Sequence, residues 1–307
     1  MVHWRGAPRP RRPPLSETLA ILADIHGNLE ALDAVLADMA VFKPDRILVL
    51  GDIVGYGPEP GACLTRVAER ADRFILGNHE RDALTSPSRH MSAPARAVIE
   101  WTARKLQGHP VWERVRERVW RDRPEGAPGL DWLASVRDGD LRLIHAAPDE
   151  PFERYVWPGN RATFLAANAL VDRKLQWFLA GFEETHAFCG HTHVPAVLIG
   201  YEHHPIFRGA GRWNRDLTFM GPNAVFFVPL GESRVDGLAG RKALINPGSV
   251  GQPRDGLAAA SYALYDGNSL LIRRVPYDVE ATIEKIFEMD IPHAVRERLA
   301  ERLEEGR

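Results

Sequence analysis

Apolar runs alternate with amphipathic stretches along the first quarter of the chain. Residues 18–23 are apolar and predict a buried strand, whereas apolar side chains recur at helical spacing in residues 29–40. Asn28 stands at the expected start of this helix, and Pro44 follows its end. The alternation continues with a strand, a helix and a strand at residues 46–50, 59–70 and 73–76. This β-α-β-α-β order predicts parallel strands covered by helices, an α/β fold.

The pattern changes in the rest of the chain. Helical patterns occupy residues 94–121, 161–180 and 278–304, the last interrupted near Pro292. Short apolar runs that end at turns predict further strands at residues 140–144, 186–189, 194–200, 224–230, 242–246, 261–265 and 269–275. The last five suggest a second, more antiparallel sheet. We expect a single domain over residues 16–307, with a helical insert at about 85–138 and a C-terminal helical segment at about 278–304.

The composition is that of a globular protein, with 45% hydrophobic and 26% charged residues among 307. Lys and Arg number 39 against 41 Asp and Glu, so a net charge of −2 provides no general attraction to nucleic acid or to anionic membranes. No apolar run approaches the roughly 20 residues of a membrane span. The two cysteines, Cys63 and Cys189, form no disulfide framework, and we expect a reducing, cytoplasmic location.

The first 15 residues mix arginine with proline and contain no acidic residue. No apolar stretch follows them, as a signal peptide would require. We expect a disordered basic tail at residues 1–15, with a short nucleic-acid-binding arm as the less favoured alternative.

Five polar motifs each follow an apolar, strand-like run. They are Asp24-Ile25-His26-Gly27-Asn28, Gly51-Asp52, Gly77-Asn78-His79-Glu80, His145 and Gly190-His191-Thr192-His193. Side chains at the carboxyl ends of strands in an open α/β sheet converge on one edge. Mixed oxygen and imidazole ligands suit Mn, Fe, Ni or Zn. Two such ions about 3.5–4 Å apart would clamp a phosphoryl group and acidify a bridging water.

The order of these motifs resembles the calcineurin-like metallophosphoesterase superfamily, whose pattern is D-x-H, GD, GNH, H and GHxH. The resemblance covers residues 18–193, and residues 246–251 (Asn-Pro-Gly-Ser-Val-Gly) extend it to an element common in bacterial members. It implies a four-layer αββα sandwich of two packed mixed sheets flanked by helices. It also implies that Asp24, His26 and His193 hold one metal ion, that Asn78, His145 and His191 hold the second, and that Asp52 bridges both.

His79 follows the expected ligand Asn78 and is not itself expected to bind metal. A histidine there can protonate a leaving alkoxide or stabilise the transition state as imidazolium. The hypothesis is that a metal-bridging hydroxide attacks phosphorus in line while the cations and His79 neutralise the developing charge. Glu80 could orient His79 or simply be solvated at a helix start.

The chain departs from the Ser/Thr protein phosphatases of the superfamily. In those enzymes the Gly-Asp motif continues to a second Asp and an Arg, and another Arg precedes Gly-Asn-His; here Gly55, Tyr56 and Leu76 stand in these places. We therefore expect a phosphodiesterase acting on small or nucleotide substrates. A phosphomonoesterase and a dinucleoside polyphosphate hydrolase are alternatives. A non-catalytic binding or scaffold protein of the same fold is the competing class, but this chain retains every expected ligand. A DNA nuclease would bring a more basic surface.

Three further residues are candidates for substrate binding. Asn28 caps a helix and could also lie near the pocket. Tyr56 could stack on a base or bind a phosphate, or pack beneath its loop. Arg254 could grip phosphate through its guanidinium group or pair with Asp255 in a turn. The Trp-rich segment and the C-terminal helix could support a homo-oligomer.

Overall fold

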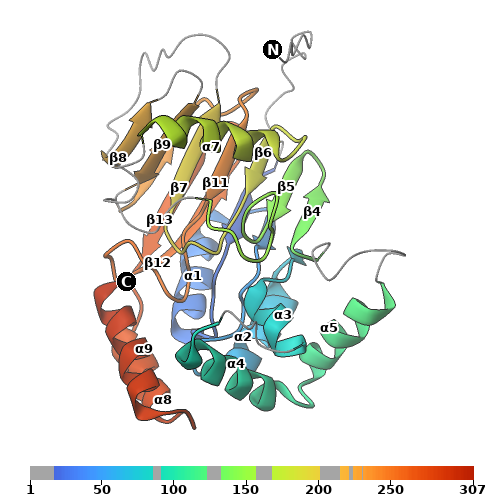
Figure 1. The fold of residues 1–307 in the computed structure, drawn as a ribbon, viewed down its shortest axis with the longest axis vertical. Coiled ribbons are helices and arrows are strands. Elements are labelled where there is room, and N and C mark those ends of the chain that lie inside the picture. Colours follow the sequence, from blue (N-terminus) through green and yellow to red (C-terminus); the bar gives the residue numbers. More distant parts are fainter. Residues whose placement is uncertain are drawn as a thin grey trace.

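The computed structural model describes residues 17–85, 91–122, 133–156, 168–200, 215–220, 224–229 and 231–307. Two β-sheets pack face to face, with helices on their outer sides (Figure 1). This is the predicted α/β class. The expected tail of residues 1–15, and the first part of the helix expected at residues 161–180, lie outside the described residues.

The first sheet has the strand order β10-β13-β12-β1-β2-β3. Its strands in chain order are β1 (Leu19–Leu22), β2 (Arg46–Val49), β3 (Arg73–Phe74), β10 (Ser233–Val235), β12 (Ala260–Tyr265) and β13 (Leu270–Val275). β1, β2 and β3 are parallel, as the alternating pattern predicted. On the other side of β1, β12 pairs antiparallel, with Leu19 opposite Tyr265.

The assignment of residues 261–265 and 269–275 to a second sheet was wrong. They form an antiparallel hairpin that extends the first sheet. This hairpin pairs with β1, although β1 lies near the start of the chain and the hairpin near its end. A local pattern of apolar residues identifies a strand but not a distant partner, so this pairing could not be inferred from the pattern.

The second sheet has the strand order β4-β5-β6-β11-β7-β9-β8. Its strands are β4 (Ser135–Asp138), β5 (Leu141–Ile144), β6 (His186–Phe188), β7 (Ala196–Gly200), β8 (Arg215–Met220), β9 (Ala224–Pro229) and β11 (Ala243–Asn246). β5, β6 and β11 are parallel, and the other pairs are antiparallel, so this sheet is also mixed. The pattern had not predicted β4, β8 or β10.

The helices are α1 (Leu29–Phe42), α2 (Pro60–Arg70), α3 (Asn78–Leu84), α4 (Ala93–Leu106), α5 (Pro110–Arg121), α7 (Asn168–Ala180), α8 (Val279–Phe287) and α9 (His293–Glu305). The C-terminal segment breaks at Pro292, as predicted. No helix among the described residues is long and apolar enough to cross a membrane.

The alternation of side chains along β1 explains the layers. Leu19 and Ile21 pack with Phe188 of the second sheet in the central core. Ala20 and Leu22 point the other way, into a cluster with side chains of α1 and α2. A third cluster joins the outer face of the second sheet to α7. The result is the four-layer sandwich, with each sheet buried on both faces.

The C-terminal helix lies against the helical segment that follows α3. Val295, Leu299 and Leu303 of α9 share an apolar cluster with Val98 and Trp101 of α4. Spacing of four residues places the three α9 side chains on one face. This contact brings the end of the chain close to the loops that follow β1 and β2.

Candidate metal centre

The predicted ligands all lie after the carboxyl ends of strands, six of them in loops. Asp24 and His26 follow β1, Asp52 follows β2, His145 follows β5, and His191 and His193 follow β6. Asn78 is the first residue of α3, shortly after β3. All seven are buried. The fold therefore brings together residues that are far apart in sequence, as parallel strands of adjacent sheets allow.

These side chains form two clusters that share one carboxylate. Ligand atoms of Asp24, His26, Asp52 and His193 lie within 4.8 Å of one another, as do those of Asp52, His145 and His191. Oδ1 of Asn78 lies 3.0 Å from Nε2 of His145, which places this amide beside the second cluster. The grouping is the one that the family resemblance implies, with Asp52 between the two sets.

The first cluster presents nitrogen lone pairs to a common point. Nε2 of His26 lies 3.0 Å from Nε2 of His193. Nδ1 of His26 lies 3.2 Å from the carbonyl oxygen of Val54, and Nδ1 of His193 lies 2.6 Å from that of Gln252. A carbonyl only accepts, so each Nδ1 carries the proton and each Nε2 keeps a lone pair.

Neither ring is expected to be charged. Burial lowers the pKa of both histidines well below the usual value, and nearby positive groups, including Arg254, lower it further. Two facing lone pairs repel each other, but they suit a cation that both can bind, and the backbone carbonyls would orient the rings. The donor set therefore fits a divalent metal ion.

The second cluster differs from the first in that one of its histidines is protonated. Nδ1 of His145 lies 2.8 Å from the carbonyl oxygen of Leu50, while its Nε2 faces Asn78 and lies 3.4 Å from Oδ2 of Asp52. Burial lowers the pKa of His145, but Asp52 and Asp24 more than offset this and raise it to about 9. His145 is thus an imidazolium at neutral pH in the metal-free protein, and a metal ion would have to displace its proton.

His191 completes this cluster through its other nitrogen. Its Nε2 lies 3.2 Å from the carbonyl oxygen of Glu153, which leaves Nδ1 to act as a ligand. Burial and the neighbouring His145 lower the pKa of His191 to about 3, so the ring is neutral. The ring of Tyr155, 45% exposed, stacks on it with centroids 4.5 Å apart.

The backbone is strained at the centre. Seven described residues other than glycine have a positive φ, and all but Lys43 lie here: Asp24, His26, Asp52, Tyr56, His191 and His193, with φ between 50° and 67°. Each such residue costs about 1–3 kcal/mol, and such strain concentrates at functional sites. Glycines in the motifs draw attention to these turns, but the conformation of the non-glycine residues has no signal in the sequence.

Glu80 has neither of the two roles considered for it. Its carboxylate is fully buried and accepts backbone N–H bonds from Asp52 (2.9 Å), Val54 (2.9 Å) and Gly77 (2.7 Å). It therefore joins the loop after β2 to the start of α3. Burial and the Asp52 charge raise the pKa of Glu80 to about 7, although the backbone donors oppose this.

The loop after β11 supports the centre from the other side. The hydroxyl of Ser249 and the N–H of Gly251 both donate to the backbone carbonyl of Asp24, at 2.7 and 2.9 Å. The amide of Asn246 donates to the carbonyl of Gly190, at 2.7 Å. Residues 246–251 thus hold the two metal-side loops in place. The sequence had identified this segment but assigned it no role.

His79 lies between two aromatic rings rather than beside a carboxylate. Its ring centroid is 4.6 Å from that of His26 and 4.5 Å from that of Tyr56, and its backbone N–H donates to Oδ1 of Asp52 at 2.9 Å. Its Nδ1 is buried without a hydrogen-bond partner among the described residues. Burial lowers the pKa of His79 to about 4, even though Asp52 opposes this.

Gly55 leaves room for this ring. Its φ is +87°, and a Cβ atom on residue 55 would lie 1.9 Å from Nδ1 of His79. Any side chain at this position would collide with the histidine. Ring packing, and not a carboxylate at position 55, therefore orients His79.

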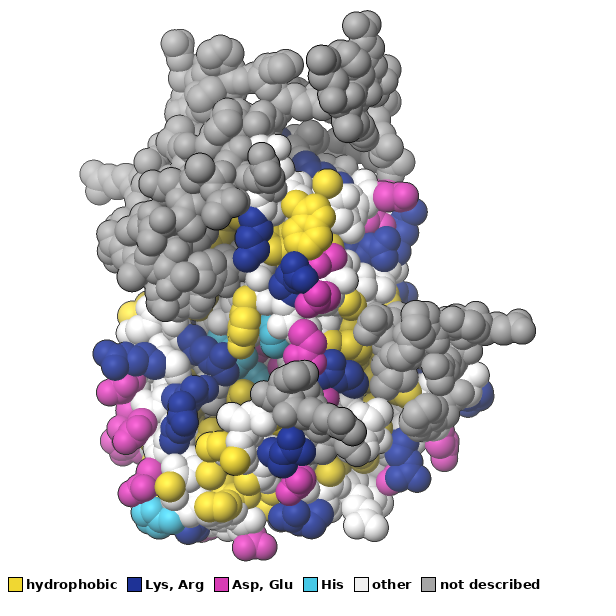
Figure 2. All heavy atoms as spheres, in the orientation of Figure 1, with side chains coloured by type: hydrophobic (Ala, Val, Ile, Leu, Met, Phe, Trp, Pro, Cys, Tyr) yellow, Lys and Arg dark blue, Asp and Glu magenta, His cyan; other side chains and the backbone are white. Residues whose placement is uncertain are grey.

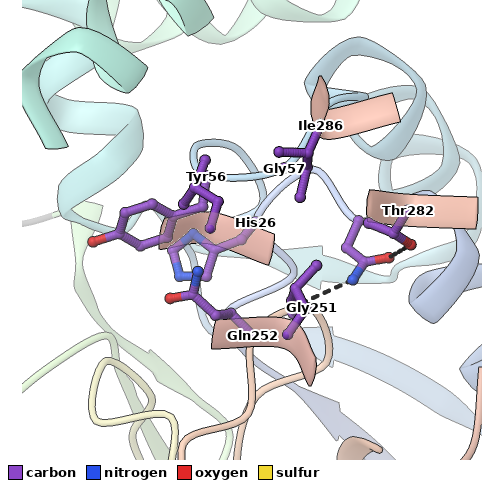
Figure 3. Close-up of a pocket in the computed structure, with 10 residues that line it drawn as sticks. His26, Tyr56, Gly57, Gly251, Gln252, Thr282 and Ile286 are labelled. Carbon is purple, nitrogen blue, oxygen red and sulfur yellow. Dashed lines mark hydrogen bonds between the residues drawn. The ribbon is translucent and has the colours of Figure 1, made fainter. Parts of the chain in front are cut away.

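Asn28 is fully engaged in structural contacts. Its Oδ1 accepts from the N–H of Ala31, which caps α1, and from the hydroxyl of Thr282, both at 3.1 Å. Its Nδ2 donates to the carbonyl of Gly251 at 2.9 Å. The side chain lines a small cavity, and other residues that line it, among them His26, Tyr56 and Thr282, are labelled in Figure 3.

Arg254 does not pair with Asp255, which instead binds Arg274 at 2.9 Å. Nη2 of Arg254 donates to Oε1 of Gln252 at 2.8 Å, and its guanidinium carbon lies 5.9 Å from the centre of the Tyr56 ring. Its Nε is buried without a partner among the described residues. Tyr56 itself contacts His26 and also joins the apolar cluster of α8, α9 and α4.

Comparison with known proteins agrees with the family resemblance seen in the sequence. Residues 18–195 match the family described as calcineurin-like phosphoesterase. An uncharacterized protein of Methanocaldococcus jannaschii is 28% identical over 290 residues, which is 92% of this chain and 96% of that protein. A symmetrical bis(5′-nucleosyl)-tetraphosphatase of Acidovorax sp. (strain JS42) is 30% identical over 145 residues, only 42% of this chain and 43% of that enzyme.

A solved structure shares the fold over nearly the whole chain. The crystal structure of a metallophosphoesterase from Sphaerobacter thermophilus is 28% identical in sequence and superposes with a TM-score of 0.66. The match covers 94% of this chain and all of that one.

Proposed function

This chain belongs to the calcineurin-like phosphoesterase family, and from that premise we propose that it is a metal-dependent phosphodiesterase that acts on small or nucleotide substrates. The observation that supports this most strongly is the position of Asp52. Its carboxylate is common to two buried His/Asp clusters, which is the arrangement that two adjacent cations require.

The residues that would hold the ions are those of the two clusters. Asp24, His26 and His193 would hold one ion, Asn78, His145 and His191 the other, and Asp52 both. Mixed carboxylate, amide and imidazole donors suit Mn, Fe, Ni or Zn. Such ions, when bound, would draw charge from the phosphoryl oxygens and make water a stronger nucleophile at neutral pH.

The chain itself supplies positioning and proton handling. Nδ1 of His79 faces the backbone of Gly55, which leaves Nε2 to meet a substrate oxygen. The lowered pKa keeps this imidazole neutral at neutral pH in the metal-free protein, so it would act there as a hydrogen-bond donor through one N–H. The contact with Tyr56 and the backbone bond to Asp52 fix its place.

The preference for diesters follows from the missing guanidinium groups. A phosphomonoester dianion carries one more negative charge than a diester, and the protein phosphatases of the family offer arginines to meet it. Here Tyr56 and Leu76 occupy these positions, and Leu76 is buried in an apolar cluster with Val119 and Phe152. Without guanidinium groups at these two positions, the site suits the less charged substrate.

A dinucleoside polyphosphate is the second candidate substrate. Part of the chain is similar to symmetrical bis(5′-nucleosyl)-tetraphosphatases. The exposed ring of Tyr155 stacks on His191 beside the second cluster, where it offers an aromatic face for a base.

Hydrolysis of bis-p-nitrophenyl phosphate and p-nitrophenyl phosphate tests the proposal. The metal-free protein is titrated with Mn²⁺, Ni²⁺ or Zn²⁺, and bound metal is measured in parallel. We expect metal-dependent diester cleavage that Asp52→Asn abolishes. His79→Ala should lower kcat by about 10²–10⁴-fold with unchanged metal content. Cleavage of the monoester alone would contradict the diester preference, and two bound ions without activity on either ester or on nucleotides would favour a binding protein.

A further inference from the structure

We propose that Arg254, Arg298 and Arg302 form an anion subsite beside the metal centre, which binds a second, non-reacting phosphate group of the substrate. The inference rests on the proposed phosphoesterase function and narrows its substrate class to esters or anhydrides that carry more than one phosphate.

The two helical arginines line a cavity that adjoins the metal centre. The cavity measures about 70 Å³ and lies between the start of α4, the inner face of α9 and Tyr56. Arg298 and Arg302 contribute to its lining, together with Ser92 and Ala95. Because the ring of Tyr56 also contacts His26 and His79, one side chain borders both the cavity and the centre.

Arg254 approaches the same place from the loop after β11. Its guanidinium carbon lies 5.9 Å from the Tyr56 ring centre, and its positive charge helps to lower the pKa of Arg302. Burial is the largest cause of that lowering, and Arg254 and Arg298 add to it. Guanidinium groups from two distant segments therefore gather around Tyr56. Figure 2 shows Lys and Arg side chains beside the histidine side chains in the hollowed middle of this face.

These arginines have no acidic partner in the part of the chain that the structure describes. Other arginines do pair: Arg274 with Asp255, and Arg273 with Asp38. Arg298 and Arg302 are four residues apart on α9, where like charges destabilise a helix by about 0.2–0.5 kcal/mol. An unpaired cluster of guanidinium groups at a cavity favours a bound anion, and their planar forks match phosphate oxygens.

The start of α4 adds to the positive potential. This helix has 14 residues and begins at Ala93, with the hydroxyl of Ser92 accepting from the N–H of Ala95. The N-terminal end of a helix carries a partial positive charge. Ser92 and Ala95 therefore present the positive end of α4 to the cavity that the arginines line.

A solvated helix face is the simpler explanation for arginines on α9. Arg296 of the same helix shows what an ordinary arginine does there, since it donates to the backbone carbonyl of Phe287 and ties α9 to α8. Arg302 is also half-buried, but it lines the cavity with Tyr56 and donates to no carbonyl or carboxylate among the described residues. Arg298 is exposed and lines the same cavity. The missing partner of Arg302 distinguishes it from Arg296.

The test compares two ligands in one assay on the Mn²⁺-loaded full chain. Bis-p-nitrophenyl phosphate has a single phosphate, and diadenosine tetraphosphate, added as a competitor at fixed free Mn²⁺, has four. In Arg298→Gln/Arg302→Gln, we expect the inhibition constant of the tetraphosphate to rise about tenfold more than the KM of the diester, the loss expected for a charge-assisted contact. Arg104→Gln, at an exposed position on α4, is the matched control and should change neither.

A second arm measures binding without turnover. Calorimetric titration of the metal-free chain with inorganic tripolyphosphate should show weaker binding in the double variant. If the inhibition constant of the tetraphosphate is unchanged in the double variant, the assignment of a substrate phosphate to this subsite is overturned. If tripolyphosphate nevertheless binds more weakly to that variant, the arginines form a site for a free anion instead. Equal loss for diester and tetraphosphate would also overturn it, because the arginines would then act on the metal centre. If no diester is cleaved, the proposed function fails, while this arm still decides whether the subsite exists.

Discussion

The Nε2 atoms of His26 and His193 face each other at 3.0 Å, and the Nδ1 proton of each ring is directed at a backbone carbonyl. Neither nitrogen can satisfy the other, because both rings are neutral and both present lone pairs. His26 and His193 come from different sheets, since His26 follows β1 of the first sheet and His193 follows β6 of the second. Binding a cation would thus also join the two sheets.

Metal binding should therefore divide between the two clusters. We expect His193→Ala to retain about one ion per chain instead of two, and His191→Ala to retain the other, while Asp52→Asn weakens both. Elemental analysis after dialysis against limiting Mn²⁺ gives the stoichiometry. His293→Ala, at an exposed position on α9, is the control. Full occupancy in both His191→Ala and His193→Ala would exclude these histidines as ligands.

Metal binding should also release protons. His145 has a pKa of about 9 in the metal-free protein and Asp24 has one of about 7, yet a ligand binds metal only when deprotonated. At about pH 7.5 we expect roughly one proton to leave, mainly from His145; release should grow as the pH falls through 7 and vanish above about 10. Apparent affinity should accordingly rise with pH up to about 9.

Calorimetry in buffers of different ionisation enthalpy measures this release. The observed heat should change linearly with the buffer enthalpy, with a slope near one at about pH 7.5. A heat that does not depend on the buffer would show that His145 is already neutral, and that the neighbouring carboxylates do not hold its proton.

Replacing Glu80 with glutamine should lower the stability of the protein. Its two carboxylate oxygens accept three backbone N–H groups, from Asp52, Val54 and Gly77. Glu80→Gln offers one oxygen, so its NH₂ group would face at least one of these donors in a buried site. We expect a loss of about 1–3 kcal/mol in the free energy of unfolding. Urea denaturation of the metal-free protein measures it, with the exposed Glu100→Gln as the control; equal stability of the two variants would contradict the role of the carboxylate.

The sequence predicted the architecture where the pattern is local and failed where partners are distant. The buried run of β1, the amphipathic α1 and the break at Pro292 each follow from neighbours within a few residues. The pairing of β12 with β1 joins residues more than 240 positions apart, such as Leu19 and Tyr265. No local pattern specifies such a partner.

The candidate centre shows the same contrast between local sequence signals and contacts between distant residues. Order and residue type were enough to select Asp24, His26, Asp52, Asn78, His145, His191 and His193, which the structure gathers at one place. Tyr155, Arg298 and Arg302 could not be identified from the sequence. Each lies outside any motif and comes near the centre only through tertiary packing. The role of Glu80 could not be seen in the sequence either, since its three donors come from the loop after β2 and from the start of α3.

Two glycines with a positive φ help to isolate the contact with His79. Gly55 and Gly139 have φ values of +87° and +58°, so alanine is strained at either position. A Cβ at residue 55 would lie 1.9 Å from Nδ1 of His79, whereas nothing lies within 4 Å of one at residue 139, in the turn between β4 and β5. Gly139→Ala therefore measures the cost of an alanine at a positive φ without a steric contact. Gly55→Ala adds displacement of the histidine ring.

We expect Gly55→Ala to lower kcat for diester hydrolysis by about 10-fold or more, with two ions still bound, because a small misplacement of a group that must meet the substrate is costly. Gly139→Ala should lower stability by about 1 kcal/mol and leave kcat unchanged. In His79→Ala the ring is absent, so adding Gly55→Ala should have little further effect on kcat. If Gly55→Ala lowers kcat by the same factor in the native chain and in the His79→Ala variant, residue 55 acts on the metal loops. Ring packing would then not position His79.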